Sequence, residues 1–143
     1  MTPSKHTPQS HLALALLLLS AGLLACAAPG ASQARVYFTA PADGATVTSP
    51  VKVTMAADSF VVEPAGAVKA GAGHLHIMVD TDCVAAGKVV PKDGSHLHYG
   101  QGQLDAELAL SPGTHTLCLQ AADGAHLALA GAGMTQTITI TVQ

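Results

Sequence analysis

Apolar and polar residues alternate along much of the chain after residue 35. In the segment 74–80 the apolar residues Leu75, Ile77 and Val79 occupy every second position. Because successive side chains of a strand point to opposite faces, this period of two predicts a strand with one buried face. The same alternation predicts strands in the segments 46–55, 95–99, 103–110, 114–120 and 134–142, and the short apolar segments 36–38 and 60–62 are expected to be strands as well.

Turn-forming residues separate these segments. The segments 41–44 and 91–94 each end in Asp-Gly after a proline, and Ser111-Pro112-Gly113 marks a hairpin. No helical pattern stands out in this region. A set of about seven to nine short strands indicates an all-β fold, an immunoglobulin-like antiparallel β-sandwich, which we place at residues 35–143.

The first part of the chain has a different pattern. Lys5 precedes an apolar run over residues 12–24, too short for a stable membrane span and typical of a secretory signal peptide. The tetrad Leu23-Leu24-Ala25-Cys26 resembles the bacterial lipobox, which predicts a lipoprotein signal peptide at residues 1–25 and a lipid on Cys26. Ordinary cleavage after a small-residue site near residues 25–27 or 32–34 is the alternative.

Residues 26–34 are small and polar, and we expect them to form a tether. Ala27 after the cysteine resembles the sorting pattern of outer-membrane lipoproteins. The expected location is therefore the bacterial cell envelope, as a periplasmic domain whose only membrane contact is a lipid anchor in the outer membrane.

Charge narrows the range of partners. The formal net charge is −3, and Arg35 is the single arginine. A mildly acidic domain without a basic patch does not suit phosphate backbones, so nucleic acid is not an expected partner.

Two cysteines remain once Cys26 is assigned to the leader junction. In an oxidising compartment Cys83 and Cys118 have one possible intramolecular pairing, and we predict a disulfide. On the chain-entropy model this bridge would stabilise the fold by about 3 to 4 kcal/mol. A thiolate metal site is the alternative.

Two His-x-His triplets, His74-Leu75-His76 and His96-Leu97-His98, stand out among the eight histidines. On a strand, each triplet puts two imidazoles on one face, about 6 to 7 Å apart. Antiparallel pairing of the two strands would let four imidazoles converge on one ion. The triplets therefore predict a copper or zinc site, or a site for a small polar ligand.

Three further residues are weaker candidate ligands. Met78 shares the face of the first triplet, and a thioether suits copper(I). His115 shares its strand face with Leu117, which also fits a buried, hydrogen-bonded structural histidine. His126 lies at a turn edge, where we expect it to be exposed.

Catalytic patterns are lacking in the sequence. It has no Gly-x-Ser-x-Gly elbow and no glycine-rich phosphate loop leading into a helix. The pattern favours a non-enzymatic binding module. A structural or adhesive sandwich without metal, and a redox or hydrolytic metalloenzyme, are the alternatives.

Ordered motifs along the chain resemble the bacterial domain of unknown function 4399 family. The resemblance runs from about Val36 to Val142 and implies a secreted domain with shared histidines and no settled activity. Leu75 and Leu104 depart from the family pattern. The motifs are 38–47 (FTAPADGATV), 64–66 (PAG), 73–76 (GHLH) with Asp80, 96–103 (HLHYGQGQ), 112–117 (PGTHTL) and 138–142 (ITITV).

Gly73-His74-Leu75-His76 and a single disulfide also resemble copper,zinc superoxide dismutase, another β-sandwich. In that enzyme one residue separates the glycine from the first histidine, whereas Gly73 adjoins His74. The arginine near its active site has no counterpart, because Arg35 lies at the start of the domain.

Overall fold

A computed structural model describes residues 33–143, which form nine strands and no helix. The predicted signal peptide, Cys26 and most of the predicted tether lie outside the described residues. Within residues 33–143 there is no helix long and apolar enough to cross a membrane. The strands are β1 (Arg35–Ala40), β2 (Thr46–Val47), β3 (Val51–Asp58), β4 (Val61–Val62), β5 (Ala72–Val79), β6 (His96–Tyr99), β7 (Asp105–Leu108), β8 (Gly113–Ala122) and β9 (Thr135–Val142).

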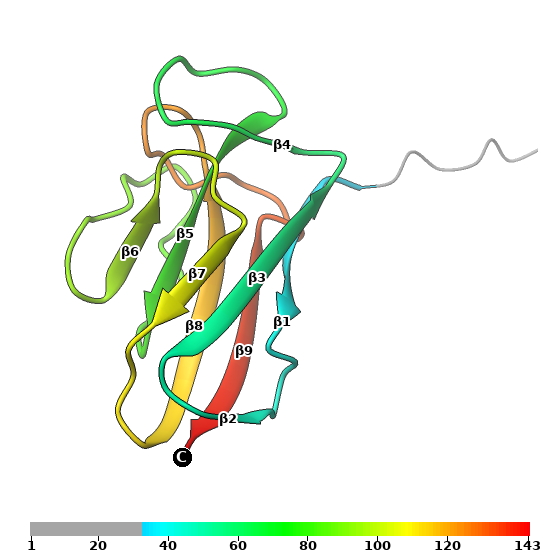
Figure 1. Cartoon of the computed structure of the whole chain (residues 1–143). Helices are drawn as coiled ribbons and strands as arrows, with labels where there is room; N and C mark the ends of the chain where they lie inside the picture. Colours follow the sequence, from blue (N-terminus) through cyan, green and yellow to red (C-terminus); the bar gives the residue numbers. More distant parts are fainter. Residues whose placement is uncertain (1–32) are drawn as a thin grey trace, which may run out of the picture. The chain divides into compact units, whose positions relative to one another are not determined.

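The strands form two sheets that lie face to face (Figure 1). One sheet has the order β1-β3-β7, and the other has the order β2-β9-β8-β5-β4, with β6 paired to β5. Most pairs are antiparallel, and β2 with β9 and β4 with β5 are parallel. The predicted all-β sandwich is confirmed.

The predicted strand at 46–55 is two strands in different sheets. Val47 ends β2 and Val51 begins β3, with Pro50 between them. Proline cannot donate a hydrogen bond to a β-ladder, so the chain leaves one sheet here and joins the other.

The apolar positions of the alternating segments form the core between the sheets. Leu75 and Ile77 of β5 pack with Leu117 and Leu119 of β8, and all four have no exposed area. Burying each such side chain contributes about 1.5 to 3 kcal/mol. The alternation therefore identified the core face of these strands correctly.

The opposite face of β5 is also buried, because the loop over residues 80–95 covers part of it. The predicted disulfide joins Cys83 of this loop to Cys118 of β8, with a Cα–Cα distance of 5.7 Å. The Gln120 side chain accepts from the Val84 amide at 2.9 Å and donates to its carbonyl at 2.7 Å. Val84, Val90, Ala122 and Ala128 form a small second core on this side. The face that carries His74 and His76 is thus an interior surface.

Candidate metal centre

Strand pairing brings three histidines together. β5 and β6 run antiparallel with His76 directly opposite His98, and His74 lies on the same face of β5. One ring nitrogen from each of these three residues lies within 4.8 Å of the others. The pairing expected from the two triplets therefore forms, and it places three of their four imidazoles at one point.

His126 places a fourth ring beside these three, although it is not among the residues whose ligand nitrogens all lie within 4.8 Å of one another. Its ring centroid lies 4.7 Å from that of His74, 4.8 Å from that of His98 and 6.0 Å from that of His76. Its Nε2 lies 3.1 Å from Nε2 of His98, while Nε2 of His74 lies 3.0 Å from Nε2 of His76. We call these four residues the histidine cluster.

His96, the remaining predicted ligand, stands outside the histidine cluster. It is paired with Met78, which lies two residues after His76 on the same face of β5. Its Nδ1 lies 2.9 Å from the Asp93 carboxylate, and Asp93 also accepts from the His96 amide. The four rings that lie together are thus those of His74, His76, His98 and His126, while the His96 ring contacts Asp93 instead.

A tight turn after β8 carries His126 to the cluster. The Asp123 carboxylate accepts from the amides of Ala125 at 2.8 Å and Leu127 at 2.9 Å. His126 has a left-handed φ of 68°, and its carbonyl accepts from the Val90 amide at 2.9 Å. His126 is partly buried rather than exposed as expected. Sequence reasoning also missed Asp123; an Asp-Gly turn directly after a strand was the available signal.

Gly100 makes room for His98. A Cβ at position 100 would overlap Cε1 and Nε2 of the His98 ring. Any larger residue would therefore push this imidazole out of its place beside His76 and His126. The glycine is needed for this close approach, since its φ lies outside the left-handed region.

Burial favours the neutral form of three rings of the cluster, those of His74, His76 and His98. His74 and His76 have no exposed area. Burial, with smaller effects from the neighbouring histidines, lowers the pKa of His74 to about 4 and that of His76 to about 3. Burial also lowers the pKa of His98, together with the nearby His126 and Lys92. At neutral pH these three rings therefore keep nitrogen lone pairs available for a ligand.

The inner side of the cluster has unmet hydrogen-bonding capacity. Nδ1 of His74 and Nδ1 of His76 are buried and have no hydrogen-bond partner among residues 33–143. Leaving a buried polar atom unpaired costs about 1 to 3 kcal/mol. These two atoms are not part of the close Nε2 pairs, so an ion bound through Nε2 would leave both of them unpaired.

The nitrogen spacing within each close pair of rings suits a transition-metal ion. Two nitrogens bound to one ion at about 2.0 to 2.1 Å lie about 2.9 to 3.4 Å apart, depending on the coordination angle. The Nε2–Nε2 distances of 3.0 and 3.1 Å fall in this interval. Imidazole nitrogens suit copper and zinc.

The remaining predicted candidates are Met78 and His115. Met78 is fully buried on the cluster face of β5, opposite Cys118 of β8. His115 uses both ring nitrogens elsewhere, with Nδ1 at 2.7 Å from the Asp80 carboxylate and Nε2 at 2.9 Å from the Ser111 carbonyl. Those contacts raise the pKa of His115 and agree with a structural role.

The fold and this site define a class of protein: a small β-sandwich with one disulfide and a cluster of histidines that is enclosed on its inner side. A family model described as "Domain of unknown function (DUF4399)" matches residues 53–143, more than half of the chain. The chain belongs to this family. The match runs from β3 to the C-terminal residue and contains the four clustered histidines and both cysteines of the disulfide. No curated protein and no solved structure matches the chain.

Proposed function

We propose that this protein is a cell-envelope binding module that holds one copper or zinc ion through His74, His76, His98 and His126. The convergence of four imidazoles in two close Nε2 pairs carries the proposal. The neutrality of the buried rings supports it, because a metal ligand must be deprotonated.

The number of histidine nitrogen donors favours a binding role over catalysis. Catalytic zinc sites usually combine three protein ligands with an open position, whereas four imidazoles complete a tetrahedral shell. The single arginine, Arg35, pairs with Asp58 at 2.7 Å at the edge of the other sheet. It therefore supplies no guanidinium to the cluster, unlike the arginine of the superoxide dismutase that the first histidine triplet resembles.

The location in the cell envelope rests on the leader and the disulfide. The Cys83–Cys118 bridge fits an oxidising compartment. Anchoring in the outer membrane through a lipid on Cys26 is part of the proposal. Palmitate labelling that appears in the wild type and disappears in Cys26→Ser is the expected result, and an unlabelled wild type would rule the anchor out.

Calorimetric titration with copper(II) and with zinc(II) tests the metal site. The protein should carry no polyhistidine tag, because a tag would bind either ion. We expect one ion per chain in the wild type and a loss of at least about tenfold in affinity, or about 1.4 kcal/mol, in His76→Ala and in His126→Ala.

Two histidines outside the cluster supply matched controls. His96→Ala and His115→Ala remove the same side chain from positions where the ring contacts a carboxylate. Both should keep wild-type affinity. Absence of binding in the wild type, or equal losses in the controls, would overturn the proposal.

The second candidate function is a structural sandwich without metal. Each Nε2–Nε2 contact is also compatible with one neutral ring donating N–H to the other. In that case, replacing the cluster histidines lowers thermal stability, and a chelator changes nothing. Thermal unfolding of the wild type with and without chelator separates the two functions.

A further inference from the structure

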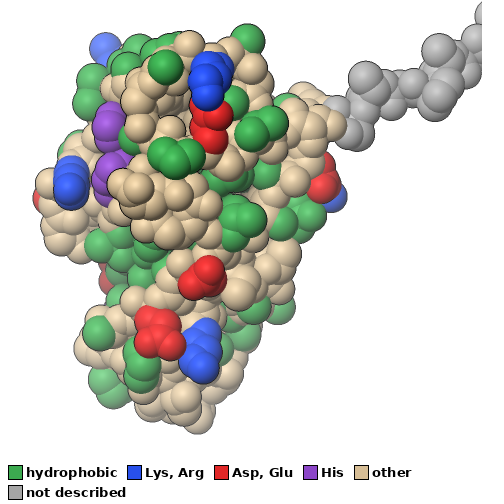
Figure 2. Space-filling view, turned by 45° about the horizontal axis from the view of Figure 1, so that its top comes forward, with side chains coloured by type: hydrophobic (Ala, Val, Ile, Leu, Met, Phe, Trp, Pro, Cys, Tyr) green, Lys and Arg blue, Asp and Glu red, His purple; other side chains and the backbone are tan. Residues whose placement is uncertain are grey.

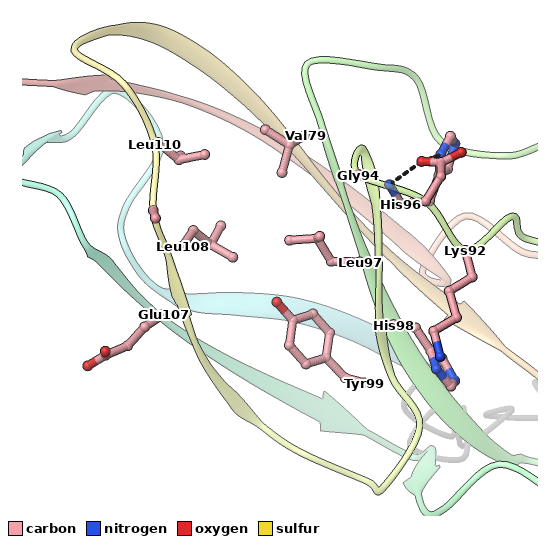
Figure 3. Close-up of a pocket in the computed structure, with 12 residues that line it drawn as sticks. Val79, Lys92, Gly94, His96, Leu97, His98, Tyr99, Glu107, Leu108 and Leu110 are labelled. Carbon is pink, nitrogen blue, oxygen red and sulfur yellow. Dashed lines mark hydrogen bonds and ion pairs between the residues drawn. The ribbon is translucent and has the colours of Figure 1, made fainter.

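An apolar cleft of about 500 Å³ lies beside the histidine cluster, and its lining includes residues from both sheets (Figure 3). We propose that this cleft binds a small amphipathic carboxylate, a molecule with one anionic head group and an apolar body. The volume falls within the range of about 300 to 1,000 Å³ typical of small-molecule pockets.

The cleft exists because two edge strands face each other without pairing. Within residues 33–143, β6 pairs only with β5 and β7 only with β3. The chain crosses from one sheet to the other between Tyr99 and Asp105 without a strand that would close the gap. The space between the two edges therefore stays open.

The inner walls of the cleft are apolar. Val79, Leu97 and Tyr99 line it from the six-stranded sheet, and Leu108 and Leu110 line it from the side of β7 (Figure 3). All but Leu108 are only partly buried, since the open gap leaves one side of each uncovered. An apolar ligand body would remove this surface from water, which favours binding.

The charged side chains lie at the rim of the cleft, and Lys92 is the one among them that would attract an anion. Lys92 extends alongside His98 at this rim, and its ammonium has no ion pair or hydrogen bond within residues 33–143 (Figure 3). The Asp93 carboxylate is already engaged by the His96 ring and two backbone amides. The Glu107 side chain points away from the cleft (Figure 3). Lys92 is thus the cation at the rim that is available to a ligand, and all three printed contacts of Asp93 are made by one of its two carboxylate oxygens.

The cleft is distinct from the histidine cluster, although His98 borders both. Its apolar walls do not include His74, His76 or His126. The proposed carboxylate site therefore does not depend on a bound ion. Measurements on chelator-treated protein test the cleft alone, and the metal titrations test the cluster alone.

Titration of the chelator-treated protein with octanoate, octanol and octylamine, followed by amide NMR shifts, tests the proposal. These probes share an apolar chain and differ in head-group charge. We expect shifts centred on Leu97, Tyr99 and Leu108, with octanoate binding at least about tenfold more tightly than octylamine. Lys92→Ala should weaken octanoate by about fivefold, the strength of one exposed ion pair, and leave octanol unchanged.

Lys88→Ala is the matched control, because Lys88 is an exposed lysine of the same loop that does not line the cleft. It should bind octanoate as the wild type does. The proposal is overturned by shifts confined to other surfaces, by octylamine binding as well as octanoate, or by no effect of Lys92→Ala. Absence of octanoate binding at millimolar concentration overturns it as well.

Discussion

Gly100 leaves open the space that the His98 imidazole fills, and a Cβ at this position would coincide with ring atoms of His98. The two residues are separated by one position on the chain, so the contact is local. Gly100 has no side chain that could bind an ion, yet it determines whether the His98 ring can lie in the cluster.

Substituting Gly100→Ala should weaken metal binding without removing any ligand. The new methyl group would overlap the His98 ring, and because this ring is partly exposed, we expect it to shift toward solvent. We expect affinity for copper(II) or zinc(II) to fall by at least about tenfold, as for the loss of a ligand. Calorimetric titration measures the change.

Gly94→Ala is the control for this variant, since a Cβ there meets no atom within 4 Å and the backbone needs no left-handed φ. It should bind metal as the wild type does. Unchanged affinity in Gly100→Ala would show that His98 is not a ligand.

Stability of the metal-free protein should fall as pH decreases from about 6.5 toward 4. The folded-state pKa values of His74 and His76 are lowered to about 4 and about 3, whereas an unfolded histidine titrates near 6.5. In this interval the unfolded state binds more protons, so acid favours unfolding. At about 1.4 kcal/mol for each pKa unit, the combined effect amounts to several kcal/mol.

Urea unfolding in chelator at pH 7.5 and pH 5 measures this dependence. A His74→Gln/His76→Gln variant should show a flatter pH profile than the wild type, because the groups that take up protons on unfolding are gone. Equal unfolding midpoints of the wild type at the two pH values would contradict the prediction.

Removing the disulfide should destabilise the fold and loosen the loop over residues 80–95. Cys83 ties this loop to Cys118 beneath it, and the Gln120–Val84 hydrogen bonds are the next contact along β8. A Cys83→Ser/Cys118→Ser variant should lose about 2 to 5 kcal/mol. Urea unfolding measures the loss, and amide hydrogen exchange of Val84 and Val90 should rise. Wild-type exchange in the variant would mean that the bridge does not hold the loop.

His115 should titrate above the usual histidine value. Its hydrogen bonds to Asp80 and to the Ser111 carbonyl raise its pKa, and hydrogen bonds from the Thr116 amide and from His115 lower the pKa of Asp80. The ion pair therefore stabilises the fold at pH values between the pKa of Asp80 and the pKa of His115. Its contribution is less than about 1 kcal/mol, because Asp80 is half exposed.

An NMR titration of the His115 ring protons checks this assignment. The midpoint should lie above 6.5 in the wild type and move down in Asp80→Asn. An unmoved midpoint in that variant would show that Asp80 is not the partner of His115 in solution.

Period-two patterns predicted the strands and part of the site. Alternation identified Leu75 and Ile77 as core residues, and it put His74 and His76 together on the other face. Pairing with β6 then added His98, as the spacing of the triplets suggested. The alternation of side chains along a strand is a local property of the backbone, so it can be predicted from a single sequence.

The alternation pattern could not predict the features of the site that depend on loops. His126 reaches the cluster through a turn that Asp123 stabilises, and the turn has no periodicity. Burial of the histidine face was also missed, because the covering loop is fixed by a disulfide and by Gln120 rather than by an apolar pattern. Which face of a strand a loop covers is a tertiary property.

The four rings of the histidine cluster are unequal in their access to water. His74 and His76 are fully enclosed, while His98 and His126 are partly exposed. Histidine side chains reach the molecular surface near a basic side chain in Figure 2. An ion held by all four would therefore enter and leave past the two outer rings, one fixed by a strand and the other by a turn. The rate at which the ion exchanges with another metal-binding molecule would then depend on how readily the turn at residues 123–127 opens. The enclosed pair, His74 and His76, would hold the ion away from the molecular surface.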